Sequence, residues 1–283
     1  MPDYTAAQLA AARRRVLILC KTYPSPSSRY VETSCVAGMD ESGAMVRLYP
    51  VPFRLIASDQ QFRKWQWIEA RIRKAKEDHR PESHRISVDT IEVEGEPLST
   101  ANSWFQRRQA LVAAQEVFND FDELERARQQ RGVSLALLRP GKLLQLQISK
   151  ADSSQWSDDE VAKLMQAQSQ GHLFDEVAEQ RSLKLLKKLP FDFRYVYECS
   201  ANGVTSAYSH KLVDWEAGAL YWNVHRRPDW EAAFRQRFSD VFAERDVYFL
   251  MGTIHRFPQQ WLIVSVLYLP KQPDDQARQG QLF

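Results

Sequence analysis

The sequence predicts an α+β protein with a small N-terminal β-barrel, a helical middle and a small C-terminal α+β domain. Short alternating segments separated by turns fill residues 15–95. Helical periodicity replaces this pattern from 103 to 131, and strands and helices mix again from 191 to 270. At 283 residues the chain is long enough for two ordinary domains, or for one domain with a large insertion.

The N-terminal segment is predicted to hold about five short strands. The apolar run RVLILC, residues 15–20, has strand length and ends at the loop signal TYPSPSSRY. Residues 30–51 are typical of a β-hairpin that turns at DESG. Apolar residues at every second position favour further strands over 65–74 and 86–93. This spacing indicates a small barrel of the OB type, with an SH3-like barrel as the nearest alternative.

The rest of the chain is predicted to be a helical connector with one strand, a C-terminal domain and a tail. Ser103 can cap a helix, Gly132 can end the helical stretch, and a strand is expected around 143–148. A strand, two helices and a closing hairpin make up the expected C-terminal domain. Its polar tail should be disordered and carry a docking peptide. The expected division is 1–100, 101–190, 191–270 and 271–283.

The composition limits the function. The net charge is only +2, so any surface for nucleic acid must be a local patch. Three widely spaced cysteines fit a reducing cytosol, and a cytoplasmic protein is expected. The longest apolar stretch, WLIVSVLYL, is too short to cross a bilayer, so no membrane association is predicted. Neither GxxxxGK[ST] nor GxGxxG occurs, which argues against a nucleotide-dependent motor or a dinucleotide enzyme.

Candidate nucleic-acid contacts cluster in RKWQWIEARIRKAKEDHR, residues 63–80. Cations interleaved with tryptophans are what single-strand binders use, the rings for bases and the charges for phosphates. Single-stranded DNA is therefore the favoured partner. The alternative is that the tryptophans belong to the barrel core. With one arginine from the hairpin of residues 30–51 and one from the last hairpin, the candidate contacts are Arg47, Arg63, Trp65, Trp67, Arg71 and Arg256.

Candidate catalytic residues lie mainly in the C-terminal third, and they are His210, Asp214, Glu216 and His255. His210 and Asp214 are four residues apart, so a helix would place them on one face, where they could bind a metal or pair an acid with a base. Cys199 and His210 are weak metal candidates because paired ligands at short spacing are absent. No cofactor is predicted, and a divalent metal stays open. The alternative is that Asp214 merely suits the positive end of a helix.

The last five residues, Gln279-Gly280-Gln281-Leu282-Phe283, resemble the short peptide by which bacterial DNA polymerases and mismatch-repair proteins dock on the sliding clamp. The resemblance implies that Gln279, Leu282 and Phe283 are the anchors. Gly280 departs from the aliphatic residue of that pattern, which implies weaker binding. The internal QGHLF, residues 170–174, fits the pattern equally well. The alternative for the tail is that Leu282 and Phe283 fold back onto their own domain.

Three longer segments, VLILCKTYPSPSSRYVETSCVAG, VRLYPVPFR and HKLVDWEAGALYWN, are similar to segments of uncharacterised bacterial proteins described as containing dual OB-type barrels. The resemblance implies a fold and names no activity. Some of those proteins carry extra cysteines near the position of Cys199, which this sequence lacks.

These observations together predict a DNA-associated accessory protein of genome maintenance or phage defence. The barrel would bind nucleic acid and the tail would dock on the sliding clamp. Two alternatives remain open. One is a metal-dependent nuclease or nucleic-acid hydrolase that uses the C-terminal domain, and the other is a protein-interaction module without nucleic-acid contact.

Overall fold

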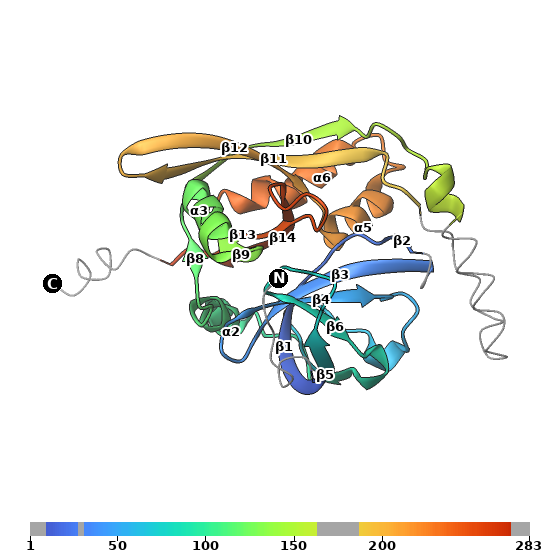
Figure 1. Cartoon of the computed structure of the whole chain (residues 1–283). Coiled ribbons are helices and arrows are strands. Elements are labelled where there is room, and N and C mark those ends of the chain that lie inside the picture. The colour runs from blue at the N-terminus through green and yellow to red at the C-terminus, as the bar shows by residue number, and fades with distance from the viewer. Residues whose placement is uncertain (1–9, 28–30, 163–186, 273–283) are drawn as a thin grey trace.

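The computed structural model of the chain describes residues 10–27, 31–162 and 187–272. In this part of the chain a barrel and a second sheet with its helices lie one against the other (Figure 1). The predicted α+β class, with an N-terminal barrel, is confirmed. Among the described residues, no helix is both long enough and apolar enough to cross a membrane.

Five strands of the first sheet close into the barrel. β1 pairs with β3 on one side and β5 on the other, and β4 pairs in parallel with β6. The resulting ring, β1–β3–β4–β6–β5, is consistent with an OB-like barrel. Two short strands, β2 and β7, extend its edges. The bounds are β1 (Ala12–Lys21), β2 (Ser25–Ser27), β3 (Val31–Asp40), β4 (Met45–Val51), β5 (Trp67–Lys74), β6 (Ser83–Ile86) and β7 (Glu92–Glu94).

Strand β1 is buried on both of its faces. Ile18 points into the barrel core together with Ile68, whereas Leu17 and Leu19 point outward into a second apolar layer. Leu17, Ile18 and Leu19 are all fully buried. A strand that is covered on both faces has an uninterrupted apolar sequence, and this accounts for the run RVLILC.

The middle of the chain belongs largely to the second sheet. One strand was predicted between 101 and 190, but the described residues 101–162 already hold three. The predicted long helix is two helices separated by β8. Asp120 caps the second helix by accepting a hydrogen bond from the Glu123 N–H at 3.0 Å, and Gly132 ends it with φ 74°. The elements are α2 (Ala101–Val112), β8 (Val117–Phe118), α3 (Phe121–Arg131), β9 (Leu135–Leu138) and β10 (Lys142–Lys150).

The second sheet has the order β10–β11–β12–β14–β13–β9–β8. The sheet is strongly curved, so Tyr195 and Tyr197 of β11 contact Phe249 of β13. The ring centroids are 5.3 and 5.1 Å apart. Helices pack against the same core, where Phe193 stacks on Phe234 at 4.2 Å. The remaining elements are β11 (Phe191–Ala201), β12 (Val204–Leu212), α5 (Trp215–Val224), α6 (Trp230–Phe238), β13 (Arg245–Thr253) and β14 (Trp261–Pro270).

The expected helix through His210 and Asp214 is wrong for residues 210–212. These residues belong to β12, which follows β11 after a hairpin turn. Asn202 and Gly203 both have positive φ, 51° and 78°, as the Asn-Gly pair of a tight hairpin turn requires. The helix then starts at Trp215, because Asp214 caps it. His210 is therefore in a strand and does not share a helix face with Asp214.

A third apolar cluster joins the barrel to the second sheet, and we call this contact the seam. Leu17 and Met39 come from the outer face of the barrel, and Leu137, Leu250 and Leu267 come from the second sheet. All five side chains are almost fully buried. The two units thus share this apolar cluster, which fixes how the residues at its edges face one another.

Candidate functional site

A cleft of about 620 Å³ lies between the barrel and the second domain. Such a volume is within the usual range for sites that take small ligands or single units of a polymer. The barrel contributes β1 and the segment 63–65, and the second domain contributes α5, the end of α6 and β14. Its polar and aromatic lining includes Lys21, Arg63, Lys64, Trp65, Trp104, Arg107, Asp214, Trp215, Glu216, Arg237 and Tyr268.

The cleft concentrates positive charge. Five cationic side chains (Lys21, Arg63, Lys64, Arg107 and Arg237) and two carboxylates line it, which leaves three positive charges in excess. The whole chain carries only two. A local excess of this kind in a concave site attracts anionic ligands.

A charge network forms one wall of the cleft, in which Asp214 is buried and Glu216 is exposed. Lys64 Nζ lies 3.5 Å from Asp214 Oδ2 and 3.0 Å from Glu216 Oε2, and it donates to the Val266 carbonyl at 3.0 Å. The Ser265 hydroxyl donates to Asp214 at 2.6 Å. Asp214 also accepts from the Glu216 N–H at 2.9 Å, which is the cap of α5.

The pKa values in this network follow from burial and charge. Burial by itself lowers the pKa of Lys64, but Asp214 and Glu216 outweigh this and hold it above its ordinary value. Burial raises the pKa of Asp214 against the opposing charge of Lys64. Burial by itself raises the pKa of Glu216. The charge of Lys64 outweighs this effect, so the pKa of Glu216 lies below its ordinary value.

Lys21 lies at the barrel side of the cleft inside a cage of rings. Its Nζ is 3.5 Å from the centroid of Phe53 and 5.5 Å from that of Trp215. It donates to the Phe62 carbonyl at 3.1 Å. Burial lowers the pKa of Lys21 to about 8, so this side chain is still mostly charged at neutral pH.

Two tryptophans in the cleft adopt backbone conformations that are rare for bulky residues. Trp65 has φ 67° and Trp104 has φ 62°, both in the left-handed region. The Arg107 guanidinium lies 5.3 Å from the Trp65 ring and 4.9 Å from the Trp104 ring. Tyr268 contacts Trp104, with ring centroids 5.4 Å apart. Residues held in such conformations are concentrated at functional sites.

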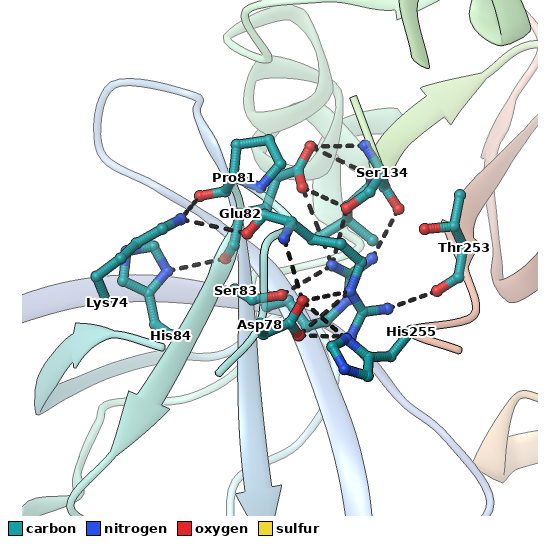
Figure 2. A network of polar contacts seen from close by, with 12 residues as sticks. Lys74, Asp78, Pro81, Glu82, Ser83, His84, Ser134, Thr253 and His255 are labelled. Carbon is teal, nitrogen blue, oxygen red and sulfur yellow. Dashed lines mark hydrogen bonds and ion pairs between the residues drawn. The ribbon is translucent and has the colours of Figure 1, made fainter. Parts of the chain in front are cut away.

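A second polar cluster crosses the seam at the loop between β5 and β6 (Figure 2). Arg47 is 3% exposed and donates to Ser83 Oγ and Ser134 Oγ, at 3.1 and 3.0 Å, and to the Ser134 carbonyl at 2.7 Å. Glu82 lies 3.9 Å from Arg47 and accepts from the Ser134 N–H at 2.9 Å. Burial lowers the pKa of Arg47. Arg47 thus ties the barrel to β9.

The same loop and the turn between β13 and β14 together carry a group of side chains that could hold a metal. Among the described residues, Asp78, His79 and His255 form the group of this kind, and their ligand atoms all lie within 4.8 Å of one another. Burial by itself raises the pKa of Asp78, but the hydrogen bonds and charge of Arg80 outweigh it and hold that pKa well below its usual range. The carboxylate is therefore ionised at neutral pH.

The predicted nucleic-acid residues do not form one surface. Arg47 and Trp65 are buried, so neither is available to a nucleic acid in this conformation. Trp67 is half-buried beneath the guanidinium of Arg15, 5.0 Å away. Three arginines are exposed: Arg63 at the cleft, Arg71 on β5 and Arg256 in the turn between β13 and β14. The periodicity of a strand does not reveal which outer face another domain covers.

The predicted catalytic and metal residues are also separated. Asp214 and Glu216 line the cleft, whereas His255 lies in the β13–β14 turn. His210 is bound to the Tyr197 hydroxyl at 3.0 Å, and burial lowers the pKa of its imidazole to about 4. Cys199 is buried in β11 opposite Ser206. Neither Cys199 nor His210 belongs to the metal-ligand group of the described residues.

Sequence reasoning missed Lys64, Arg107 and Arg237 in the cleft, and Asp78 and His79 in the second cluster. The segment 63–80 did mark this part of the barrel, because it holds Lys64, Asp78 and His79. Lys64 and Asp78 contact residues that are more than a hundred positions away in the sequence, so no local sequence pattern could reveal these contacts. The anchors proposed for the tail, Gln279, Leu282 and Phe283, and the internal QGHLF lie outside the described residues.

Two family models match the chain. Residues 12–113 match a domain of unknown function (DUF8758), and residues 117–283 match another domain of unknown function (DUF8757), which covers more than half of the chain. No curated protein matches. The two matches meet between α2 and β8, so the lining of the cleft comes from both.

Proposed function

The chain belongs to the family of the domain of unknown function DUF8757, and we propose from the lining of the cleft that it binds single-stranded DNA there. Proteins that bind single strands combine cations for the phosphates with aromatic rings for the bases. The gathering of five cationic side chains and several rings in one hollow of about 620 Å³ is the observation that carries the proposal.

The barrel face used by other oligonucleotide-binding barrels is not the proposed surface. Those barrels bind on the face of their second and third strands, which correspond to β3 and β4 here. Ala37 and Met39 of β3 lie in the seam core, and Arg47 of β4 bonds to Ser134. The proposed surface is instead the edge of the barrel where Arg63 faces α5 and α6.

Within the cleft, the exposed cations are assigned to phosphates and the rings to a base. Arg63 and Arg237 are exposed, and the ion pair of Arg63 with Glu96 is itself exposed and therefore weak. Trp104 and Tyr268 are half-buried and provide ring faces at the same hollow. Lys64 offsets one of the two negative charges of Asp214 and Glu216, and the other four cations of the lining outnumber the one that remains. The engagement of these carboxylates with Lys64 also gives no support to a nuclease.

Replacing Arg63 and Arg237 together by glutamine is expected to weaken binding of single-stranded DNA and to flatten its salt dependence. Each phosphate contact on a single strand contributes about 0.7 to the slope of log affinity against log salt concentration, so the slope should fall by about 1.4. The measurement is fluorescence anisotropy of a labelled oligothymidylate, titrated at several salt concentrations.

The matched control is the double change Arg126→Gln and Arg226→Gln, which removes the same charge from exposed positions outside the cleft. It should leave the slope nearly unchanged. Equal losses in the two double variants would show that only overall charge matters, and no binding by the wild type at low salt would reject the proposal.

We also propose that the tail docks on the sliding clamp, which would make the protein an accessory factor of genome maintenance or phage defence. This part rests on the sequence pattern of residues 279–283. A polar tether with an apolar end binds with modest affinity because it loses conformational entropy on docking.

Replacing Leu282 and Phe283 by alanine is expected to abolish binding to purified sliding clamp, measured by surface plasmon resonance. The internal pattern provides the matched control, since Leu173→Ala with Phe174→Ala removes the same side chains from QGHLF. Loss of clamp binding in the control alone would assign docking to the internal copy. A large drop in thermal stability of the tail variant would instead make the tail part of the core.

A further inference from the structure

A carboxylate and two imidazoles meet across the seam, at a place that the proposed nucleic-acid site does not use. Asp78 and His79 belong to the loop between β5 and β6 of the barrel, and His255 belongs to the turn between β13 and β14. Asp78 Oδ1 lies 3.2 Å from His255 Nδ1, and the rings of His79 and His255 are 5.5 Å apart at their centroids. Figure 2 shows Asp78 and His255 side by side.

This donor set fits a zinc-type ion. Zinc binds imidazole nitrogens and carboxylate oxygens at about 2.0–2.2 Å, and tetrahedral geometry then places neighbouring donor atoms about 3.3 Å apart. The contact of 3.2 Å between Asp78 and His255 matches that spacing. Calcium and magnesium prefer sites built from oxygen alone, so two histidines disfavour them.

The carboxylate is held in place by a second layer of contacts. Arg80 Nε donates to Asp78 Oδ1 at 2.9 Å, and Arg80 Nη2 donates to Oδ2 at 2.7 Å. Arg80 Nη1 also donates to the Thr253 carbonyl at 2.6 Å, which fastens the loop to β13 beside His255. Ligating carboxylates in metal sites are commonly hydrogen-bonded in this way, because the partner fixes their orientation.

We propose that Asp78, His79 and His255 bind a zinc ion that pins the barrel loop to the β13–β14 turn. Both histidines are exposed, so an ion can enter directly, and water can complete the coordination. The three ligands come from two parts of the chain that are far apart in sequence. A bound ion would therefore strengthen the contact between the two domains at this edge of the seam.

The test is a titration of the metal-free full chain with Zn²⁺, followed by isothermal calorimetry and by thermal unfolding. The wild type should bind one ion at this site and melt at a higher temperature when Zn²⁺ is present. His79→Ala and His255→Ala should each lose the site and the stabilisation. Because both side chains are exposed, each variant should melt like the wild type without metal, which separates loss of ligands from misfolding.

His225→Ala is the matched control, since His225 lies outside the group and bonds to the Trp222 carbonyl. This variant should retain the full response to Zn²⁺. Amide hydrogen exchange tests directly whether the ion holds the loop against the turn. Zn²⁺ should slow exchange in the loop 75–82 and the turn 254–260 of the wild type, but not in His79→Ala or His255→Ala. An unchanged response in both His79→Ala and His255→Ala, or no response in the wild type, would overturn the proposal.

Discussion

Replacing Lys64 by methionine is expected to lower the free energy of unfolding by about 3–5 kcal/mol, because it removes one partner of a buried ion pair. Asp214 is 3% exposed, and it would keep the Ser265 hydroxyl and the Glu216 N–H but lose its cation. The Val266 carbonyl would also lose its donor. Urea unfolding followed by tryptophan fluorescence measures the change.

The double variant Lys64→Met with Asp214→Asn is the control for this mechanism. Asparagine is as good a helix cap as aspartate, so α5 keeps its first turn, and no unpaired charge remains at position 214. The double variant should therefore be more stable than Lys64→Met alone. A cost below about 1 kcal/mol for Lys64→Met would show that water already compensates the charge of Asp214, as at an exposed pair.

Replacing Arg47 by methionine is expected to have a comparable effect, about 3–5 kcal/mol, by a related mechanism. The change would remove the cation 3.9 Å from Glu82, and it would leave the Ser134 carbonyl with only the Thr253 N–H as a donor. Arg71→Met is the matched control, because Arg71 is an exposed arginine of the same barrel and its replacement should alter stability by less than about 0.5 kcal/mol.

Arg47 also separates two interpretations of the barrel. If Arg47 only stabilises the seam, Arg47→Met should lower the free energy of unfolding. The folded fraction of the variant should still bind single-stranded DNA like the wild type. If Arg47→Met cost no more than Arg71→Met and yet abolished DNA binding, Arg47 would face the ligand, and the outer face of β3 and β4 would be open. Paired measurements of urea unfolding and oligonucleotide anisotropy on both variants decide this.

Much of the barrel could be predicted from the sequence, because alternating strands such as residues 67–74 bury one face each. The run RVLILC carried a further signal, since consecutive apolar residues indicate that a strand is covered on both sides. That signal predicts a covered barrel, but it does not identify what covers it. Periodicity therefore could not reveal that Trp65 is buried or that Arg47 bonds to Ser134 beside the second sheet.

The cleft and the metal-ligand group were harder to predict because their members come together only through the seam. Lys64 meets Asp214, and Asp78 meets His255, across more than a hundred residues of chain. The error over β12 has a local cause: the Asn-Gly turn was present, but the strand after it carries polar residues on an exposed face. With that turn recognised, His210 is placed in a strand and the supposed pair with Asp214 disappears.

We propose that single-stranded DNA occupies the cleft between the barrel and the second domain. Photochemical cross-linking of the full chain to an iodouracil-containing oligonucleotide, followed by peptide mapping, tests this location directly. The expected adducts are on Trp104 or Tyr268, whose rings line the cleft. Adducts confined to the outer face of β5 around Arg71, with none in the cleft, would show that DNA binds elsewhere on the protein.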